Sequence, residues 1–159
     1  MQLEIERKWL LRKSPNIKYF TRENIIIQQY SGDLRIREEI SSAGSVYTAT
    51  KKEGRGLTRV ENEVAIPHWL YATLWARFYE CPMIRKSRFY TRQPGVTVDV
   101  FSDNLEGLVL LEAEFKSEEK AKRWNPPPYL RKLIIKEVTD NSRYVNLNLA
   151  KEQQIPTQL

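Results

Sequence analysis

Charged and apolar side chains alternate one by one along several short segments of this chain, and this alternation restricts the fold more than any other feature. In segment 3–9 (LEIERKW), Glu4, Glu6 and Lys8 occupy every second position, and mostly apolar residues lie between them. Because the side chains of a β-strand point alternately to its two faces, the segment predicts a strand with one charged and one mostly apolar face. A surface strand has the same pattern, so this segment alone decides little.

The same alternation recurs along the whole chain. It is found in segments 34–37, 59–64, 96–100 and 110–115. If the charged faces of these strands converge, they line a charged channel.

The order of strands and turns predicts an antiparallel barrel. Strand-like segments span residues 3–9, 25–30, 34–40, 46–52, 58–66, 84–91, 96–101 and 108–115, and glycine-containing turns separate several of them. We expect helices after Pro67, after Ser117 and in the last part of the chain from Asp140 onward. About eight strands with short helices between them are typical of an α+β barrel, whose interior has room for side chains or one small ligand.

The predicted interior contains both signs of charge. The basic residues expected there are Lys8, Arg35, Arg37, Lys51, Arg59, Lys86 and Arg88, and the acidic ones are Glu4, Glu6, Glu61, Glu63, Asp99, Glu112 and Glu114. A ladder of ion pairs on a solvated sheet face would explain any single pair. It would not explain two carboxylates at two-residue spacing on one face, as in Glu4 with Glu6, because like charges repel unless a cation lies between them. Carboxylate oxygens of this kind favour Mg²⁺ or Mn²⁺, and facing arginines suit phosphate oxygens.

Composition narrows the class of protein. The 159 residues suit a single domain, residues 1–159, and the formal net charge of +6 suggests an anionic partner. The basic residues are dispersed among acidic ones, which favours a local anion pocket over a groove for duplex nucleic acid. The sequence has neither a signal-like start nor an apolar run of membrane-spanning length, so we expect a cytoplasmic protein without membrane contact. With one cysteine and one histidine, any metal must be held by oxygen ligands.

Residues 4–8, EIERK, match the E-x-E-x-K signature of the CYTH superfamily, the triphosphate tunnel metalloenzymes. This superfamily includes class IV adenylate cyclases, thiamine triphosphatases and inorganic triphosphatases. Six further segments resemble successive blocks of its small bacterial branch, almost from end to end, and they are 28–30, 34–37, 58–63, 84–89, 111–114 and 136–139. The resemblance implies a closed eight-stranded antiparallel β-barrel with short flanking helices, and a triphosphate held inside it with one or two divalent metals.

The resemblance also implies residue roles. Glu4, Glu6, Glu112 and Glu114 resemble the metal ligands, with Asp99, Glu61 and Glu63 as secondary candidates. Arg35, Arg37, Lys51, Arg59, Lys86 and Arg88 resemble the phosphate-binding residues. Lys8 resembles the signature lysine, expected in catalysis and phosphate binding, and Tyr30 is expected to hydrogen-bond it and to help manage the proton of the attacking water. If the register of this strand shifts by one residue, Lys52 faces the interior in place of Lys51.

The function that this resemblance implies is metal-dependent hydrolysis of inorganic triphosphate to pyrophosphate and phosphate. The alternatives are a class IV adenylate cyclase, which makes cyclic AMP and pyrophosphate from ATP, and a thiamine triphosphatase, which would need Trp9, Trp69 or Trp75 at the tunnel mouth for stacking. A non-catalytic module that binds polyphosphate or RNA 5′ ends would need the basic residues but not so many carboxylates. A homodimer formed through an outer face of the barrel is also compatible with the sequence.

Overall fold

The computed structural model describes residues 2–54 and 56–157 of the chain. Within them, the strands are β1 (Gln2–Leu11), β2 (Phe20–Ser31), β3 (Leu34–Ser41), β4 (Gly44–Glu53), β5 (Thr58–Ala65), β6 (Met83–Thr91), β7 (Val96–Phe101), β8 (Val109–Phe115) and β9 (Ile134–Glu137). The α-helices are α1 (His68–Arg77), α2 (Glu118–Arg123), α3 (Pro128–Arg131) and α4 (Asn146–Glu152). Single 3₁₀ turns occur at η1 (Ile17–Tyr19), η2 (Asp103–Leu105) and η3 (Ser142–Tyr144).

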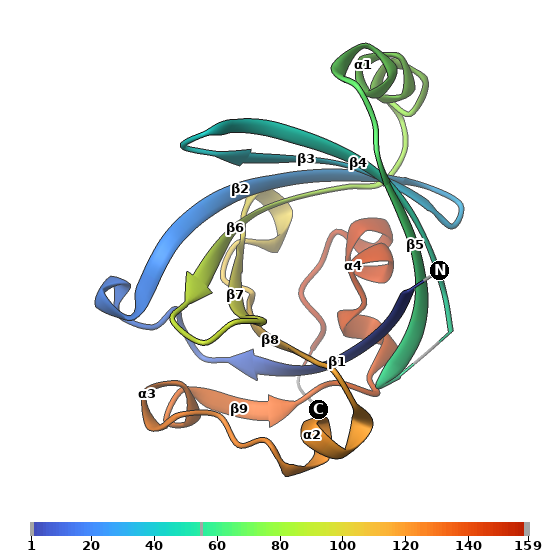
Figure 1. Ribbon diagram of the computed structural model, residues 1–159. Coiled ribbons are helices and arrows are strands. Elements are labelled where there is room, and N and C mark those ends of the chain that lie inside the picture. Colours follow the sequence, from blue (N-terminus) through green and yellow to red (C-terminus); the bar gives the residue numbers. More distant parts are fainter. Residues whose placement is uncertain (1, 55, 158–159) are drawn as a thin grey trace.

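Strand β1 closes the barrel because it pairs along both edges. Its first residues pair antiparallel with β5, with Glu4 opposite Arg59, and residues 5–11 pair antiparallel with β8. The circuit then runs through β4, β3, β2, β6 and β7, and every pairing in it is antiparallel (Figure 1). The prediction of a closed eight-stranded antiparallel barrel is therefore confirmed.

Tight turns keep neighbouring strands in register. The β3–β4 hairpin turns between Ser41 and Gly44, which are register partners, and Gly44 has a φ of 120°. A residue with a Cβ atom would be strained at that angle, so glycine suits this position. The register matters for the site because a slip of one residue would move every interior charge to the outer face.

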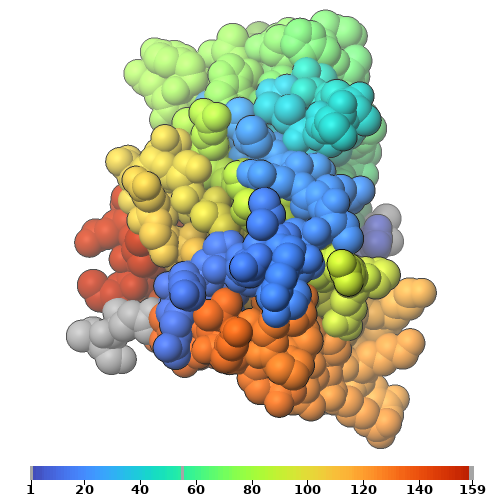
Figure 2. Space-filling model, turned by 90° about the vertical axis from the view of Figure 1, so that its left-hand side faces the viewer, coloured from blue at the N-terminus to red at the C-terminus, as the bar shows by residue number. Residues whose placement is uncertain are grey.

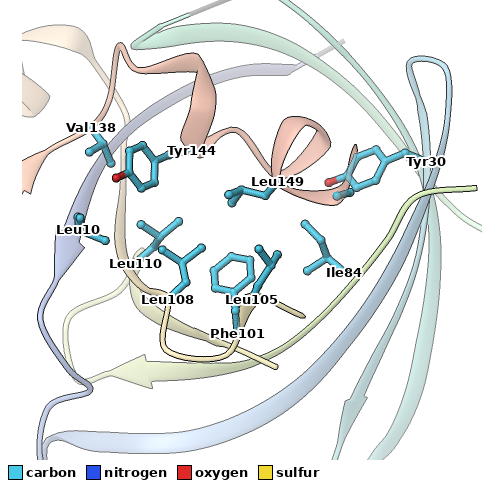
Figure 3. Packing of buried hydrophobic residues seen from close by; sticks show 11 residues of the cluster. Leu10, Tyr30, Ile84, Phe101, Leu105, Leu108, Leu110, Val138, Tyr144 and Leu149 are labelled. Carbon is cyan, nitrogen blue, oxygen red and sulfur yellow. The ribbon is translucent and has the colours of Figure 1, made fainter. Parts of the chain in front are cut away.

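One apolar cluster lies on the inner face of the strands, at one end of the barrel. Leu10, Leu110 and Ile84 lie two residues from the charged positions on β1, β8 and β6, and the C-terminal helix α4 packs on them through Leu149 (Figure 3). Figure 1 shows α4 inside the ring of strands. Burial of each such leucine or isoleucine contributes about 1.5–3 kcal/mol, so this end is a packed core and the charged part of the interior lies beyond it.

A second apolar cluster covers the outer face of β1, β7 and β8. Trp9, Val98 and Leu111 pack there against Leu130 of α3 and Trp124, which ends α2. On the same side, the ring of Tyr19 in η1 stacks on Tyr129 of α3 at a centroid distance of 4.1 Å. Figure 2 shows this face, where the blue start of β2 lies against the orange segment that includes α3. The alternation of each strand thus serves two cores, one on each side of the sheet.

Several elements differ from the sequence-based expectation. The short helix α3 and strand β9 were not expected, and β9 adds to the second half of β1, with Trp9 opposite Glu137. Strand β2 starts five residues earlier than expected, at Phe20, because its first part pairs with β6. The expected helix from Asp140 onward is divided into η3 and α4. The helices expected after Pro67 and Ser117 are present as α1 and α2.

Candidate active site

A cavity of about 1200 Å³ occupies the charged part of the barrel. The charged residues that line it are Glu4, Glu6, Lys8, Asp33, Arg35, Arg37, Lys52, Arg59, Glu61, Glu63, Arg88, Glu112, Glu114 and Lys116. They come mostly from β1, β3, β5 and β8, whose alternation turns these side chains inward. The predicted charged channel is therefore present.

Three carboxylates gather at one side of this cavity. One oxygen atom from each of Glu4, Glu6 and Glu114 lies within 4.8 Å of the other two. Glu6 and Glu114 are direct partners across the β1–β8 pairing, and Glu4 lies two residues further along β1. Glu114 is exposed at the cavity surface, and partial desolvation together with the charges of Glu6 and Glu4 raises its pKa to about 7. The Glu114 carboxylate forms no ion pair with any residue that the structure describes. Glu4 and Glu6 have cationic partners in Lys52, Lys8 and Arg59. Three carboxylate oxygens this close together, one of them from a carboxylate without such a partner, fit a divalent ion such as Mg²⁺ or Mn²⁺.

Lys8 lies deeper in the barrel, between two carboxylates. Its Nζ atom is 3.2 Å from Glu112 and 3.5 Å from Glu6. Burial by itself would lower the pKa of Lys8, but the charges of Glu112 and Glu6 more than compensate and raise it. The side chain is thus an ammonium ion, which donates hydrogen bonds and does not accept a proton.

Four arginines among the described residues line the cavity. Of these, Arg35, Arg88 and Arg37 differ in how they are paired. Arg35 lies 3.2 Å from Glu63 and also donates to Thr50. Arg88 lies 2.9 Å from Glu112 and binds Asp99 as well. Arg37 has no carboxylate within 4.0 Å among residues 2–54 and 56–157, and its Nε atom donates to Gln28 at 3.0 Å.

The electrostatic surroundings of Arg37 are those of an anion site. Burial and the positive charges of Arg35 and Arg88 lower its pKa to about 10, so the guanidinium is still charged at neutral pH. A partly buried cation next to two others is unfavourable unless an anion joins them. Phosphate oxygens match the planar donors of arginine.

Lys52 faces the cavity, and the prediction that Lys51 does so is wrong. The Nζ atom of Lys52 lies 2.9 Å from Glu4 and 3.2 Å from Glu61. Lys51 instead lies on the outer face, half exposed and 3.3 Å from Asp33. The reason is that Thr50 points inward to hydrogen-bond Glu63, so its neighbour must point outward.

Besides Lys51, two more predicted site residues lie outside the cavity lining. Lys86 and Asp99 are completely buried and form an ion pair, and Asp99 also accepts two hydrogen bonds from Arg88. Burial tends to raise the pKa of Asp99, but Arg88 and Lys86 overcome this effect and lower it. Asp99 therefore serves as the counter-charge of two cations and is not grouped with the three clustered carboxylates. The structure does not bring Lys86 or Asp99 into the cavity lining, although both belong to the predicted interior.

The remaining predicted carboxylates are held by cations. Glu112 lies between Lys8 and Arg88, and it is not part of the cluster of Glu4, Glu6 and Glu114. Glu61 and Glu63 both lie near Arg35, at 3.6 and 3.2 Å. Arg59, opposite Glu4 on β5, lies 3.2 Å from Glu6. These pairs hold the phosphate-binding candidates in place around the cavity.

Tyr30 lines the cavity but does not have the partner expected for it. Its hydroxyl oxygen accepts a hydrogen bond of 2.7 Å from Gln28, and no hydrogen bond joins Tyr30 to Lys8 among the described residues. Burial raises the pKa of Tyr30, so the phenol is neutral. Gln28 and Thr50 were not among the predicted site residues, although both occupy inward positions two residues from Tyr30 and Lys52. Their two-residue spacing from Tyr30 and Lys52 is the sequence signal that would have placed them on the inner face.

The aromatic residues that could stack a heterocycle lie elsewhere. Trp9 belongs to the outer apolar cluster, and Trp69 and Trp75 are on α1, which packs on the outside of the barrel against β4 (Figure 1). Among the described residues that line the cavity, Tyr30 and Phe115 are the aromatic ones. None of the helices in the described part of the chain combines the length and apolar character of a membrane span.

Comparison with known proteins gives consistent relatives. No protein-family model matches the chain. A protein of Nitrosomonas europaea named inorganic triphosphatase is 32% identical over 154 residues, which cover 92% of this chain and 96% of that protein. A protein of Acetivibrio thermocellus with the same name is 31% identical over 157 residues, which cover 95% of each.

Solved structures have the same architecture. The crystal structure of an inorganic triphosphatase matches with a TM-score of 0.61 and 27% identity, over 99% of both chains. A protein of Pyrococcus horikoshii OT3 shares the fold, with a TM-score of 0.60 and 22% identity, over 95% of this chain and 99% of that one.

Proposed function

The chain belongs to the inorganic triphosphatase family of the CYTH superfamily, and from this premise we propose that it hydrolyses inorganic triphosphate to pyrophosphate and phosphate with Mg²⁺ or Mn²⁺. The relatives named inorganic triphosphatase cover nearly the whole of this chain, which supports the same activity here.

One observation carries the proposal. A single cavity contains Arg37, a partly buried cation without a carboxylate partner among the described residues, and the cluster of Glu4, Glu6 and Glu114. The first suits an anion and the second suits a cation. A phosphate chain together with a divalent ion satisfies both, whereas an anion alone would leave Glu114, which has no ion-pair partner among the described residues, next to two other carboxylates.

The chain's own residues bind and orient the substrate in this proposal. Arg35, Arg37 and Arg88 donate hydrogen bonds to phosphate oxygens, and Lys8 adds a positive charge held between Glu6 and Glu112. Lys52 and Arg59 reach the cavity from the side of the carboxylate cluster. These fixed charges stabilise the negative charge that is redistributed during phosphoryl transfer, and such stabilisation accounts for most of the catalysis in this class of reaction.

Glu4, Glu6 and Glu114 would hold the divalent ion. When bound, such an ion supplies charge neutralisation at phosphate oxygens and lowers the pKa of a nearby water. Glu112, Glu61 and Glu63 serve instead as counter-charges for the lysines and arginines that contact them, and Asp99 serves Lys86 and Arg88 in the same way.

Inorganic triphosphate fits the cavity better than ATP or thiamine triphosphate. Charged side chains dominate the lining, and Trp9, Trp69 and Trp75 are absent from its described residues. A base or thiazole ring would therefore lack a tryptophan platform. The predicted cytoplasmic location, the homodimer, the absence of duplex nucleic acid binding and the single-domain organisation stay predictions.

Phosphate release from inorganic triphosphate, ATP, thiamine triphosphate and pyrophosphate tests the proposal, with Mg²⁺, with Mn²⁺ and with chelator. We expect metal-dependent release that is strongest from inorganic triphosphate. Formation of cyclic AMP from ATP would indicate a cyclase, and binding of triphosphate without turnover under any metal condition would indicate a binding module.

Two variants test the residue roles. Glu114→Gln should abolish turnover while the fold persists, because it removes the carboxylate without an ion-pair partner from the cluster. Arg37→Ala should chiefly raise KM, because it removes the free cation. Lys51→Ala is the matched control, since Lys51 lies outside the cavity. Wild-type turnover by Glu114→Gln would contradict the metal assignment.

A further inference from the structure

A chain of two hydrogen bonds joins two residues of the cavity lining through a third residue, which is on the inner face of β2 but fully buried and not part of the described lining. The Nε atom of Arg37 donates to Oε1 of Gln28 at 3.0 Å, and Nε2 of Gln28 donates to the hydroxyl oxygen of Tyr30 at 2.7 Å. Arg37 and Tyr30 line the cavity. Gln28 is completely buried and is absent from the described lining, and it lies opposite Arg37 across the β2–β3 pairing. Any effect of Gln28 on a ligand must therefore pass through these two neighbours.

The chemistry of the three side chains fixes the direction of both hydrogen bonds. A guanidinium only donates, so the amide of Gln28 must turn its oxygen toward Arg37. Its NH₂ group then faces Tyr30, and the tyrosine oxygen has to accept. Burial raises the pKa of Tyr30, so its own hydrogen is retained and is left over for a second hydrogen bond.

That hydrogen has no acceptor among the charged groups nearest to it. The charges that act on the Tyr30 hydroxyl come from Arg35, Arg37 and Lys8, and all three groups can only donate. Arg35 is the direct partner of Tyr30 across the β2–β3 pairing. The Tyr30 hydroxyl donates no hydrogen bond to any residue in the described part of the chain. Its hydrogen is therefore available to an acceptor within the cavity, and the nearby positive charges favour a negatively charged one.

We propose that Gln28 is a positioning residue that holds the Tyr30 hydroxyl as a hydrogen-bond donor to a phosphate oxygen of the substrate. This inference rests on the proposed function, because it takes the phosphate chain as the occupant of the cavity. It makes Tyr30 a neutral donor beside Arg35 and Arg37 and not an acceptor of the water proton. It also ties the orientation of Tyr30 to that of Arg37.

Gln28→Glu reverses the direction of the hydrogen bond between residue 28 and Tyr30 with almost no change of side-chain shape. A carboxylate can accept from Arg37 and also from the Tyr30 hydroxyl, so it draws the tyrosine hydrogen away from the cavity. The variant also neutralises part of the Arg37 charge, and this second effect must be separated from the first. Tyr30→Phe removes the donor itself and provides the background for that separation.

The experiment is a double-mutant cycle of wild type, Gln28→Glu, Tyr30→Phe and the double variant. The readouts are kcat and KM for inorganic triphosphate, and the calorimetric affinity for inorganic triphosphate in chelator. Losing a hydrogen bond to a charged group costs about 1.5–3 kcal/mol, so we expect Tyr30→Phe to lower kcat/KM by roughly 10- to 100-fold. Gln28→Glu should lower kcat/KM by a clearly larger factor in the wild type than in Tyr30→Phe, because the Arg37 effect is common to both backgrounds.

Equal factors in the two backgrounds would overturn the inference. Gln28→Met, which has a similar shape and no hydrogen-bonding amide, repeats the cycle if Gln28→Glu fails to fold, as judged by circular dichroism and thermal unfolding. If the wild type binds triphosphate without hydrolysing it, the proposed function fails, and the same cycle on the calorimetric affinity still tests Gln28. A wild type that does not bind triphosphate would overturn both.

Discussion

Asp99→Asn should destabilise this protein severely, because Asp99 is the shared counter-charge of two buried cations. The Asp99 side chain has no exposed area, and it accepts hydrogen bonds from Lys86 Nζ and, at 2.7 and 2.8 Å, from Arg88 Nε and Nη2. Arg88 keeps Glu112 when Asp99 is neutralised, whereas Lys86 has no other carboxylate within 4.0 Å in the described part of the chain. Leaving a buried charge uncompensated costs about 3–5 kcal/mol.

This loss is a large share of the total stability, which is about 5–15 kcal/mol for a domain of ordinary size. With a urea dependence of about 1–3 kcal/mol per molar, the unfolding midpoint should fall by on the order of 2 M. The assay is equilibrium urea unfolding followed by circular dichroism, with wild type and variant at the same pH.

Lys86→Met is the matched comparison. It removes the ammonium together with its desolvation cost, and Asp99 keeps both hydrogen bonds from Arg88. We expect a loss below about 2 kcal/mol, clearly smaller than for Asp99→Asn. Equal losses for the two variants, or an Asp99→Asn variant within about 1 kcal/mol of wild type, would refute the reasoning.

Three further predictions concern the cavity and its surroundings. The pKa of Glu114 is raised to about 7 from an ordinary value of 4.5, so its ionisation opposes folding increasingly as the pH rises between these values. In chelator, Glu114→Gln should therefore raise the thermal unfolding midpoint relative to wild type at about pH 8 but not at about pH 5. An equal difference at both pH values would contradict this prediction. Lys52→Ala should lower kcat/KM for triphosphate by roughly 10-fold or more through loss of a charged contact, while Lys51→Ala has little effect. A larger loss for Lys51→Ala than for Lys52→Ala would contradict the placement of Lys52 in the cavity. Arg7→Met should lower the free energy of unfolding in urea by about 2 kcal/mol, because Arg7 binds Glu137 and two carbonyl groups near α2. KM should not change, because Arg7 lies outside the cavity. Wild-type stability of the variant would contradict this anchoring role.

The barrel and the presence of both signs of charge on its interior face could be predicted from the sequence alone. Side chains on a strand must alternate between two faces, so the spacing of Glu4, Glu6 and Lys8 and of Glu112 and Glu114 specifies which residues share a face without knowledge of their neighbours. The same spacing could also have located Gln28 and Thr50 on the inner face.

Which of these charges meet depends on the folded structure. Glu112 and Glu114 are equivalent in the sequence pattern, yet Glu112 lies between Lys8 and Arg88, whereas Glu114 meets Glu4 and Glu6. Asp99 likewise pairs with Lys86 and Arg88 on the neighbouring strand β6. The physical reason is that alternation specifies a face but not the register and tilt of the facing strands, and Coulomb interactions depend on the distances that these set across the barrel.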